Sequence, residues 1–581
     1  MKLYTKRQQL EILRSQLDNE RSTFTAHWRD LSDFVQPRRA RFYTSDVNKG
    51  DRRNQKIIDS TATMALRTLR SGMVSGITSP ARPWFRLTTP DPDLAEFGAV
   101  KMWLHQVQRI MTTSMLKSNL YNTLPVVYGD LGLFGTAPMS LEESFTGDVF
   151  HTQSFPVGSY MIAKNDIGMV DTFVREFRMT VRQVVQKFGI NEAGNEIDWS
   201  NISSYVKNLW DINQTEQWIE IVHTIMPNPE YDPRRLESKY KKFKSVYYER
   251  GLSGNTTQGY LQSGDDEKML SEKGYDYFPI LCPRWEVTGE DVYGTDCPGM
   301  LALGDVKQLQ LGERRLMEAI EKMIRPPMVG PATLKNQSAS ILPGDITYLD
   351  MRDSQAGFRP AHEVNFRIQE MEMKQNQVRN RIQRAFFEDL FLMLASSDRR
   401  QITAREIEER HEEKLLALGP VLEQLNQDLL DPLIDIVFDI HLRQKLLPPI
   451  PDELQGMDLK VEYISIMAQA QKLVGIQGIE RMAGFTGQLA SMDPNVLKKV
   501  KFDQMIDVYA DIISLDPGIV RTDDEMQEMV AAEQAAAAQQ NAMMEAQAVA
   551  QTAKTLSDTQ IQGDNALSGL LSQANAGNLV G

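Results

Sequence analysis

Residues 301–325, LALGDVKQLQLGERRLMEAIEKMIR, predict one long α-helix. At 1.5 Å per residue such a helix is roughly 37 Å long. Two of its glutamates stand four residues before a lysine or an arginine, which is the order in which such pairs stabilise a helix. Pro326 and Pro327 end it, because proline has no N–H to donate and its ring clashes with the preceding turn.

A second long helix is predicted over residues 363–394, after an insert at 326–362 that is rich in Gly, Pro and Ser. The insert contains two strand-like pieces, around Ile341 and Ile346. The apolar positions of the second helix follow a near-heptad seam that Gln375 interrupts. They are Ile368, Met371, Val378, Ile382 and Ala385. The pattern predicts an antiparallel stalk with a small β-like module at its tip, suited to packing in a ring or bundle. A core hairpin of a monomer fits it equally well.

The first half of the chain predicts helices followed by a β-rich region. Residues 3–36, 59–76 and 100–131 have apolar side chains at helical spacing. The region from about 145 to 290 reads as strands, with a hairpin signal at 165–168. Further strands are predicted in QWIEIVHTIMP, KSVYYERG and YFPILCPRWEV. A sheet packed under helices makes the expected fold class α+β, predominantly α.

The stretch GITSPARPWFRLTTP, residues 76–90, combines Gly, Ser, two Arg and Trp, and so resembles a catalytic or anion-binding loop at first sight. Gly76 ends the preceding helix, Pro80 and Pro83 prevent its continuation, and Trp84 begins an extended apolar segment. Every residue therefore has a structural explanation, and we interpret the stretch as a joint between two elements.

A cationic loop is predicted where the second stalk helix ends. Ser396 to Gln401 break that helix, and Thr403 with Glu406 forms a capping box that starts the next one. The loop residues are Ser396, Ser397, Asp398, Arg399, Arg400 and Gln401. Both a solvated connection and transient contact with nucleic acid fit this loop.

The C-terminal part predicts further helices. They continue past Pro420 to the prolines at 448, 449 and 451, and short helices broken by glycines follow over 464–516. The tail from 523 is rich in Ala, Gln and Met, so it has high helix propensity but little apolar bulk to bury. The last stretch, 563–581, reads as flexible.

Composition excludes several classes of protein. The 581 residues contain no apolar run long enough to span a membrane, and no apolar core follows the first lysines as in a secretory signal. Two cysteines, Cys282 and Cys297, exclude a disulfide framework and favour a reducing compartment. The formal net charge of −14 argues against tight DNA binding over the whole surface.

A search for chemistry finds no catalytic or metal-binding constellation. Gly-Lys never occurs, so there is no P-loop, and RHEEK at 410–414 lacks the second histidine of a zinc-protease helix. GMVSG at 72–76 has its serine one place too late for a nucleophile elbow. The acidic runs at 265–267 and 523–525 are predicted to be solvated turn and helix-start residues. Neither a metal nor a cofactor is expected.

Several blocks of the chain resemble one family, the head-to-tail connector (portal) proteins of short-tailed bacteriophages. They are SGITSPARPWFRL (75–87), SNLYNTLPVVYGDLGLFGTAPM (118–139), MVDTFVREFRMTVRQVVQKFG (169–189), CPRWEVTGEDVYGTDCPGMLALGDVKQLQ (282–310) and QITAREIEERHEEKLLALGPVLEQLNQDLLDPLI (401–434). The resemblance extends in order over about 20–510 and depends on the combination of blocks.

The resemblance implies a non-enzymatic subunit of a ring, typically of about twelve copies, at one capsid vertex. Its parts would be a wing (1–300), stem helix 1 (301–325), a clip (326–362), stem helix 2 (363–394), a tunnel loop (395–402), wing return helices (403–463), a crown (464–522) and a helical tail or barrel (523–581). DNA would be driven in through the channel by a separate terminase ATPase and would leave by the same route.

The resemblance also assigns candidate sites and partners. The tunnel-loop residues named above would lie nearest the DNA, and Lys374, Arg379, Arg381 and Arg384 are candidates for the stem channel. Lys335, Asn336 and Gln337 in the clip are candidates for docking. The expected partners are further copies of the chain, the terminase large subunit, a tail adaptor, the major capsid and scaffolding proteins, and double-stranded DNA, with no membrane. The expected location is the virion, and the host cytoplasm during assembly.

Two other classes of function remain open from the sequence. A scaffold or minor capsid protein would assemble without conducting DNA. A DNA-processing enzyme with a dispersed acidic site would require metal-dependent nuclease activity, which the missing motifs disfavour.

Overall fold

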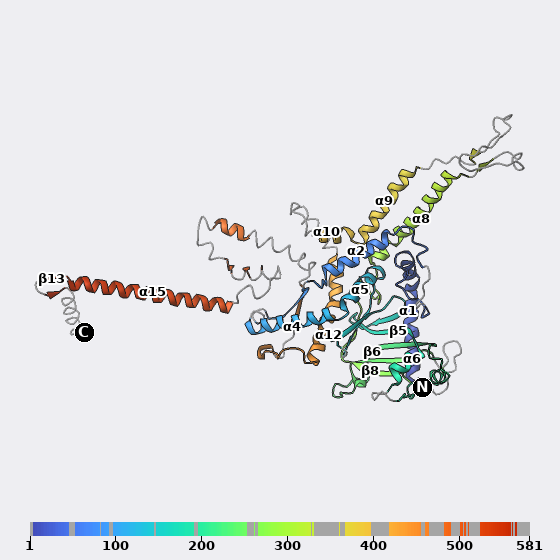
Figure 1. Cartoon of the computed structure of the whole chain (residues 1–581), viewed down its shortest axis with the longest axis horizontal. Coiled ribbons are helices and arrows are strands. Elements are labelled where there is room, and N and C mark those ends of the chain that lie inside the picture. The colour runs from blue at the N-terminus through green and yellow to red at the C-terminus, as the bar shows by residue number, and fades with distance from the viewer. Residues whose placement is uncertain are drawn as a thin grey trace. The chain divides into compact units, whose positions relative to one another are not determined.

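The computed structural model confirms an α+β chain in which helices predominate (Figure 1). It describes residues 4–45, 53–81, 83–91, 94, 97–144, 147–190, 196–251, 261, 265, 267–326, 328–329, 359–360, 367–396, 418–454, 459–463, 482–489, 500–502, 505–506, 509, 523–558, 560–561 and 564–565. The chain divides into two compact units. The first comprises 1–86, 107–448 and 461–474, and the second 87–106, 449–460 and 475–581.

The centre of the first unit's lower part is an antiparallel five-stranded sheet (Figure 1). Its strands, in order, are β4 (Tyr160–Lys164), β5 (Val170–Thr180), β6 (Trp218–Pro227), β7 (Phe243–Glu249) and β8 (Ser271–Tyr275). Because side chains alternate between the faces of a strand, each face builds its own core. One core includes Leu10 and Leu17 of α1 (Lys6–Phe34). The other includes side chains of α6 (Val181–Val184), the π-turn η1 (Val185–Gly189) and α7 (Ser204–Asp211).

The predicted hairpin at 165–168 is confirmed between β4 and β5. Asn165 Oδ1 accepts the N–H groups of Ile167 (3.1 Å) and Met169 (2.9 Å). Gly168 adopts a φ of +89°, which favours glycine. The turn that sets the pairing of β4 with β5 is therefore specified by the sequence.

A second sheet of three strands has the order β3 (Phe150–Ser154), β2 (Met139–Glu143) and β9 (Ile280–Leu281). The strand predicted in YFPILCPRWEV is thus only two residues long, with a single further bridge between Arg284 and Thr136. One acidic residue also differs from expectation. Asp265 is buried rather than solvated, because it accepts from the backbone N–H of Ser204 (3.2 Å) near the start of α7 and pairs with Lys268 (3.1 Å).

The predicted helix over 100–131 is two helices, α4 (Gly98–Lys117) and α5 (Leu120–Phe134). The break falls at Asn119, whose side chain accepts from the N–H of Thr152 (2.8 Å) and donates to its carbonyl (2.7 Å). A neighbouring strand therefore fixes the interruption. Before them lies α2 (Thr61–Gly76), which ends at the glycine that the sequence predicts. β1 (Phe85–Thr88) is the extended apolar segment that the sequence predicts within the joint at 76–90.

Two long helices project from the first unit side by side (Figure 1). They are α8 (Pro298–Ile324) and α9 (Ile368–Ala385), which confirms the first predicted stalk helix and part of the second. β10 (Met328–Val329), at the start of the insert, pairs with β11 (Arg359–Pro360), near its end. The strand-like pieces predicted around Ile341 and Ile346 lie outside the described residues.

The prediction of one helix over 363–394 is wrong at its C-terminal end. α9 ends at Ala385, and α10 (Glu388–Ser396) is a separate helix. Phe387 between them adopts a φ of +54°, a left-handed conformation that bulky residues rarely take. Phe386 is fully buried, and Phe391 of α10 covers Gly72 of α2. Tertiary packing therefore overrides the helical spacing of the sequence.

The C-terminal part of the chain contains further helices and a few short strands. Residues 418–425 are helical and continue into the π-turn η4 (Asn426–Leu430) and α12 (Asp431–Arg443). The remaining elements are η2 (Ser238–Tyr240), η5 (Asp452–Leu454), β12 (Lys460–Tyr463), the helix α15 (Asp523–Asp558) and the strands β13 (Gln560–Ile561) and β14 (Asp564–Asn565). α15 confirms the predicted helical tail. Residues 482–489 are helical through Gly484 and Gly487, so the prediction that these two glycines break a helix is wrong. The predicted capping box at Thr403 and most of the other 464–516 helices lie outside the described residues, as does 566–581. No helix within the described ranges is long and apolar enough to cross a membrane.

Candidate functional site: the helical stalk and its base

The stalk is built from the apolar seam of α9 against α8. Val378 and Ile382 are buried, as the near-heptad spacing predicts. Gln375, the polar interruption of the seam, is also buried and lies beside Gly312 of α8, where an added Cβ would sit 3.5 Å from Gln375 Nε2. A methyl group at this position would make only ordinary van der Waals contact with the glutamine, so the packing of the two helices does not require glycine here.

Two arginines of α9 tie it to α8. Arg381 pairs with Asp305 (2.7 Å), and Arg379 pairs with Glu313. Both acids lie on α8, so each cation has an intramolecular partner within the stalk. The pairs fix how α9 lies along α8.

Gln310 of α8 connects the stalk to the segment that precedes α2. This side chain is only 5% exposed. Its Oε1 accepts the N–H groups of Ile58 (2.6 Å) and Asp59 (2.9 Å), and its Nε2 donates to the Asp59 carbonyl (2.8 Å). One amide thus satisfies three backbone groups of this segment.

The Asp59 carboxylate completes this connection. Its Oδ1 accepts from the N–H of Thr61 (2.8 Å) at the start of α2, and its Oδ2 accepts from Arg379 Nε (2.9 Å). Burial alone would raise the pKa of Asp59, but the hydrogen bonds from Thr61 and Arg379 outweigh it, and the pKa lies below its ordinary value. Asp59 is therefore an ionised link between α2 and α9.

The N-terminal end of α8 is held by close backbone contact. A Cβ on Gly299 would lie 2.5 Å from the carbonyl oxygen of Leu133, and one on Gly294 would lie 2.1 Å from that of Gly135. Cys297 donates to the Leu133 carbonyl (3.2 Å), and burial raises the pKa of its thiol to about 12. The cysteine therefore has a packing role. No side chain larger than hydrogen fits at either glycine without movement of the backbone.

A buried ion pair fixes the segment that leads into α8. Arg284 donates from Nε and Nη2 to the two carboxylate oxygens of Asp428, at 2.9 and 3.0 Å. Arg284 also donates to the carbonyl of Gly168 at the β4–β5 turn (3.0 Å). Both charged side chains are almost fully buried, so removal of either one would leave an unpaired charge in the interior.

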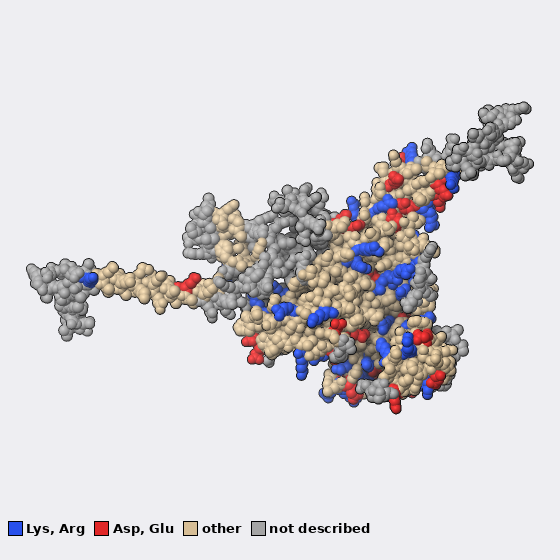
Figure 2. All heavy atoms as spheres, viewed as in Figure 1, with Lys and Arg blue, Asp and Glu red and all other residues tan. Residues whose placement is uncertain are grey.

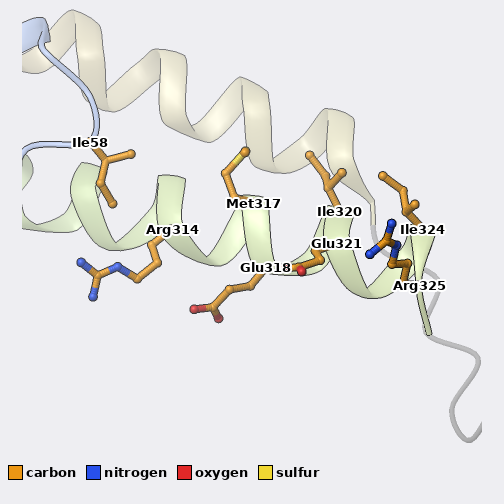
Figure 3. Close-up of a pocket in the computed structure, with 8 residues that line it drawn as sticks. All are labelled: Ile58, Arg314, Met317, Glu318, Ile320, Glu321, Ile324 and Arg325. Atoms are coloured by element: carbon orange, nitrogen blue, oxygen red, sulfur yellow. The ribbon is translucent and has the colours of Figure 1, made fainter. Parts of the chain in front are cut away.

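The outer side of α8 borders an open groove of about 530 Å³ (Figure 3). Its lining residues are Ile58, Arg314, Met317, Glu318, Ile320, Glu321, Ile324 and Arg325. Met317 is 63% exposed and Ile324 is 73% exposed. Leu301, Leu311 and Met323 of the same helix are also exposed. One chain therefore leaves an apolar surface of its stalk uncovered.

The structure places only part of the predicted site. Lys374 and Arg384 are exposed on α9, whereas Arg379 and Arg381 belong to the ion pairs of the stalk. Ser396 is the last residue of α10. Ser397, Asp398, Arg399, Arg400, Gln401 and the clip candidates Lys335, Asn336 and Gln337 lie outside the described residues.

Sequence reasoning missed Gln310, Glu313 and the tertiary role of Asp59. The helix-start pattern at Asp59 and Ser60 correctly predicts a cap, although Asp59 rather than Ser60 supplies the bond. No local pattern pairs Asp59 with an arginine 320 positions later.

The two fully buried histidines, His223 and His441, and both cysteines serve packing. His441 bonds to Ser114 Oγ (2.7 Å) and the Val437 carbonyl (2.7 Å), and His223 stacks on Tyr247. Within the described ranges, no three His, Cys, Asp or Glu side chains form a group that would hold a metal ion. The joint at 76–90 likewise packs, with Trp84 buried and its indole donating to Tyr121 (3.1 Å).

Comparison with known proteins identifies the family of this chain. The chain is 48% identical to the portal protein of Salmonella phage epsilon15 over 574 residues, which covers 98% of this chain and 99% of that protein. It is 42% identical to the probable portal protein of Bordetella phage BPP-1 over 505 residues, 87% of each chain. The family described as bacteriophage head to tail connecting protein matches residues 7–520. The chain therefore belongs to the family of bacteriophage head-to-tail connecting proteins.

Proposed function

We propose that this chain forms a ring of about twelve copies at one capsid vertex, through which the genome enters during packaging and leaves during infection. The observation that carries the proposal is the α8–α9 stalk, which is tied to the body at its base and leaves apolar side chains uncovered along α8. Exposed Met317 and Ile324 are suited to packing against a neighbouring copy.

In this proposal α8 and α9 form the stem and the insert at 326–362 forms the clip. The clip is where the terminase large subunit docks during packaging and the tail adaptor docks afterwards. The 395–402 segment is the tunnel loop, 464–522 the crown, and α15 part of a tail that extends toward the head interior. The major capsid and scaffolding proteins surround the ring in the virion, and assembly takes place in the host cytoplasm.

The charge of the chain supports a channel through which DNA passes rather than a site that binds DNA tightly. Each phosphate that a protein neutralises adds salt-dependent affinity for DNA, and a channel with many free cations would hold the genome. The net charge of −14 limits this affinity, as do the ion pairs of Arg379 and Arg381. The chain supplies the passage, and the terminase supplies the energy.

The test is DNA uptake by procapsids assembled with and without this chain, in the presence of terminase and ATP. Procapsids that contain it should package DNA into a nuclease-resistant form, and those without it should not. Equal packaging by both would contradict the proposal and favour a non-conducting scaffold or minor capsid protein.

A further inference from the structure

A strongly basic segment follows α1 in an otherwise acidic chain. Residues 38–56 contain seven Lys or Arg and two Asp, against a net charge of −14 for the whole protein. Figure 2 shows Lys and Arg side chains gathered where Figure 1 places the end of α1, the segment after it and α2, with few acidic side chains among them. None of the stalk or tunnel-loop candidates belongs to this segment.

Aromatic side chains of the basic segment hold a neighbouring cation of α1, Arg29, at the surface. The Arg29 guanidinium lies over the rings of Phe42 and Tyr43, with 5.3 and 5.8 Å to their centroids. Tyr43 is 62% exposed. Stacking on two rings orders a long side chain while its N–H donors stay available to a ligand.

The backbone that carries these rings is fixed. Arg41 donates its N–H to the carbonyl of Val157 (2.9 Å). A Cβ on Gly158 would lie 2.6 Å from the carbonyl oxygen of Arg41, so the strand connection approaches the basic segment as closely as a glycine allows. The cations are therefore presented on a preformed surface rather than on a chain that must first be ordered.

Nearby acids are already neutralised. Asp30 pairs with Lys307 (2.6 Å), and Asp33 pairs with Lys56 (2.8 Å). Within the described part of the chain, Arg29 and Arg38 are exposed and have no ion-pair partner. Two cations of the basic segment are engaged as well, Lys56 with Asp33 and Arg39 with Asp130, so the proposal uses only Arg29 and Arg38.

We propose that Arg29 and Arg38, with Tyr43 beside them, form a second DNA-binding surface that contacts the phosphate backbone of duplex DNA without reading its sequence. The guanidinium groups would donate to phosphate oxygens. With few contacts, the binding is weak and strongly dependent on salt, which suits DNA that must keep moving. None of these residues belongs to α8, α9 or the proposed tunnel loop.

The test is fluorescence anisotropy of a labelled duplex of arbitrary sequence with the full chain, over a series of NaCl concentrations. Changing both Arg29→Glu and Arg38→Glu should lower the slope of log affinity against log salt by about 1.8, at about 0.9 per lost phosphate contact, and weaken binding at low salt about tenfold. Arg29→Lys with Arg38→Lys should keep most of the affinity, because the charges remain.

The matched control is Arg234→Glu with Lys239→Glu, which makes the same charge change at exposed positions of the β6–β7 connection. If the wild-type chain fails to bind the duplex, or if the control variant loses as much affinity as the Arg29 and Arg38 variant, the proposal is wrong. Competition by poly-glutamate as effective as competition by unlabelled DNA would also overturn it, since the surface would then fit an acidic protein. Solution mass of each variant, measured separately, shows whether ring assembly has changed.

Discussion

Asp59 joins three parts of the chain through one carboxylate. It caps α2 through Thr61, pairs with Arg379 of α9, and its backbone is held by Gln310 of α8. Its pKa is lowered in the folded state, so the stability that it contributes is complete above its unfolded pKa of about 3.9. That stability is lost as the pH falls through the lower, folded pKa.

Removal of the arginine partner should therefore destabilise the base of the stalk. We expect Arg379→Met to cost about 1–3 kcal/mol of unfolding free energy, because two carboxylates lose a charged donor. The thermal midpoint should fall at neutral pH, and the loss should shrink toward pH values at which Asp59 is protonated. Lys374→Met, at an exposed position of the same helix, is the control. Equal midpoints for the two variants at neutral pH would contradict the assigned role.

The buried His223 leads to a second prediction, about how the stability of the fold depends on pH. Burial, together with Arg175 and Lys187 nearby, holds its pKa well below the ordinary value. Below about pH 6.5 the unfolded chain binds a proton that the folded chain excludes, so stability should fall with acidification by up to about 1.4 kcal/mol per pH unit. His223→Gln should flatten the thermal midpoint against pH in this range, whatever its effect at neutral pH. His151→Gln, at an exposed position, is the control. Parallel curves for wild type and His223→Gln would refute the assignment.

Packing between α2 and α10 gives a prediction at the scale of elements. A Cβ on Gly72 would lie 2.1 Å from Phe391 Cδ1. We expect Gly72→Ala to cost about 1–3 kcal/mol through overpacking, and Phe391→Ala in the same chain to recover part of that loss. Gly76→Ala is the control, since nothing lies within 4 Å of its added methyl group. Thermal midpoints of the wild type, Gly72→Ala, Phe391→Ala alone and the double variant test the coupling, and strictly additive losses would exclude a direct contact.

The sequence predicts elements best where local signals and packing agree. α8 ends before Pro326, α2 ends at Gly76 and the β4–β5 turn forms at Gly168, each from a residue type that dictates the backbone. The bend at Phe387 was not predictable, because its cause is the burial of Phe386 and the fit of Phe391 over α2.

The candidate site was predictable as a stalk but not as a set of contacts. Helical spacing and flanking prolines indicate two long helices and a small insert, and they also indicate which side of α9 is buried. They do not indicate that Arg379 and Arg381 face acids of α8 rather than a channel. Pairing across about 70 positions depends on how the helices lie along each other.

For the whole molecule, the proposed tunnel loop gives the sharpest prediction about function. Arg399→Glu with Arg400→Glu should impair packaging or genome retention while rings still assemble, because like charges would face the phosphates. Arg234→Glu with Lys239→Glu again supplies the matched control at exposed positions. Nuclease-resistant DNA per particle is the measurement. Normal filling and retention in the tunnel-loop variant would exclude these two cations from contact with DNA.

The assembly itself is the most direct test of the central claim. Negative-stain imaging of the purified protein, with its solution mass, should show closed rings of about twelve copies of the 66.0 kDa chain around a hole wide enough for duplex DNA. A compact monomer that stays monomeric even with the scaffolding and capsid proteins, and that cleaves DNA when metal is added, would contradict the account.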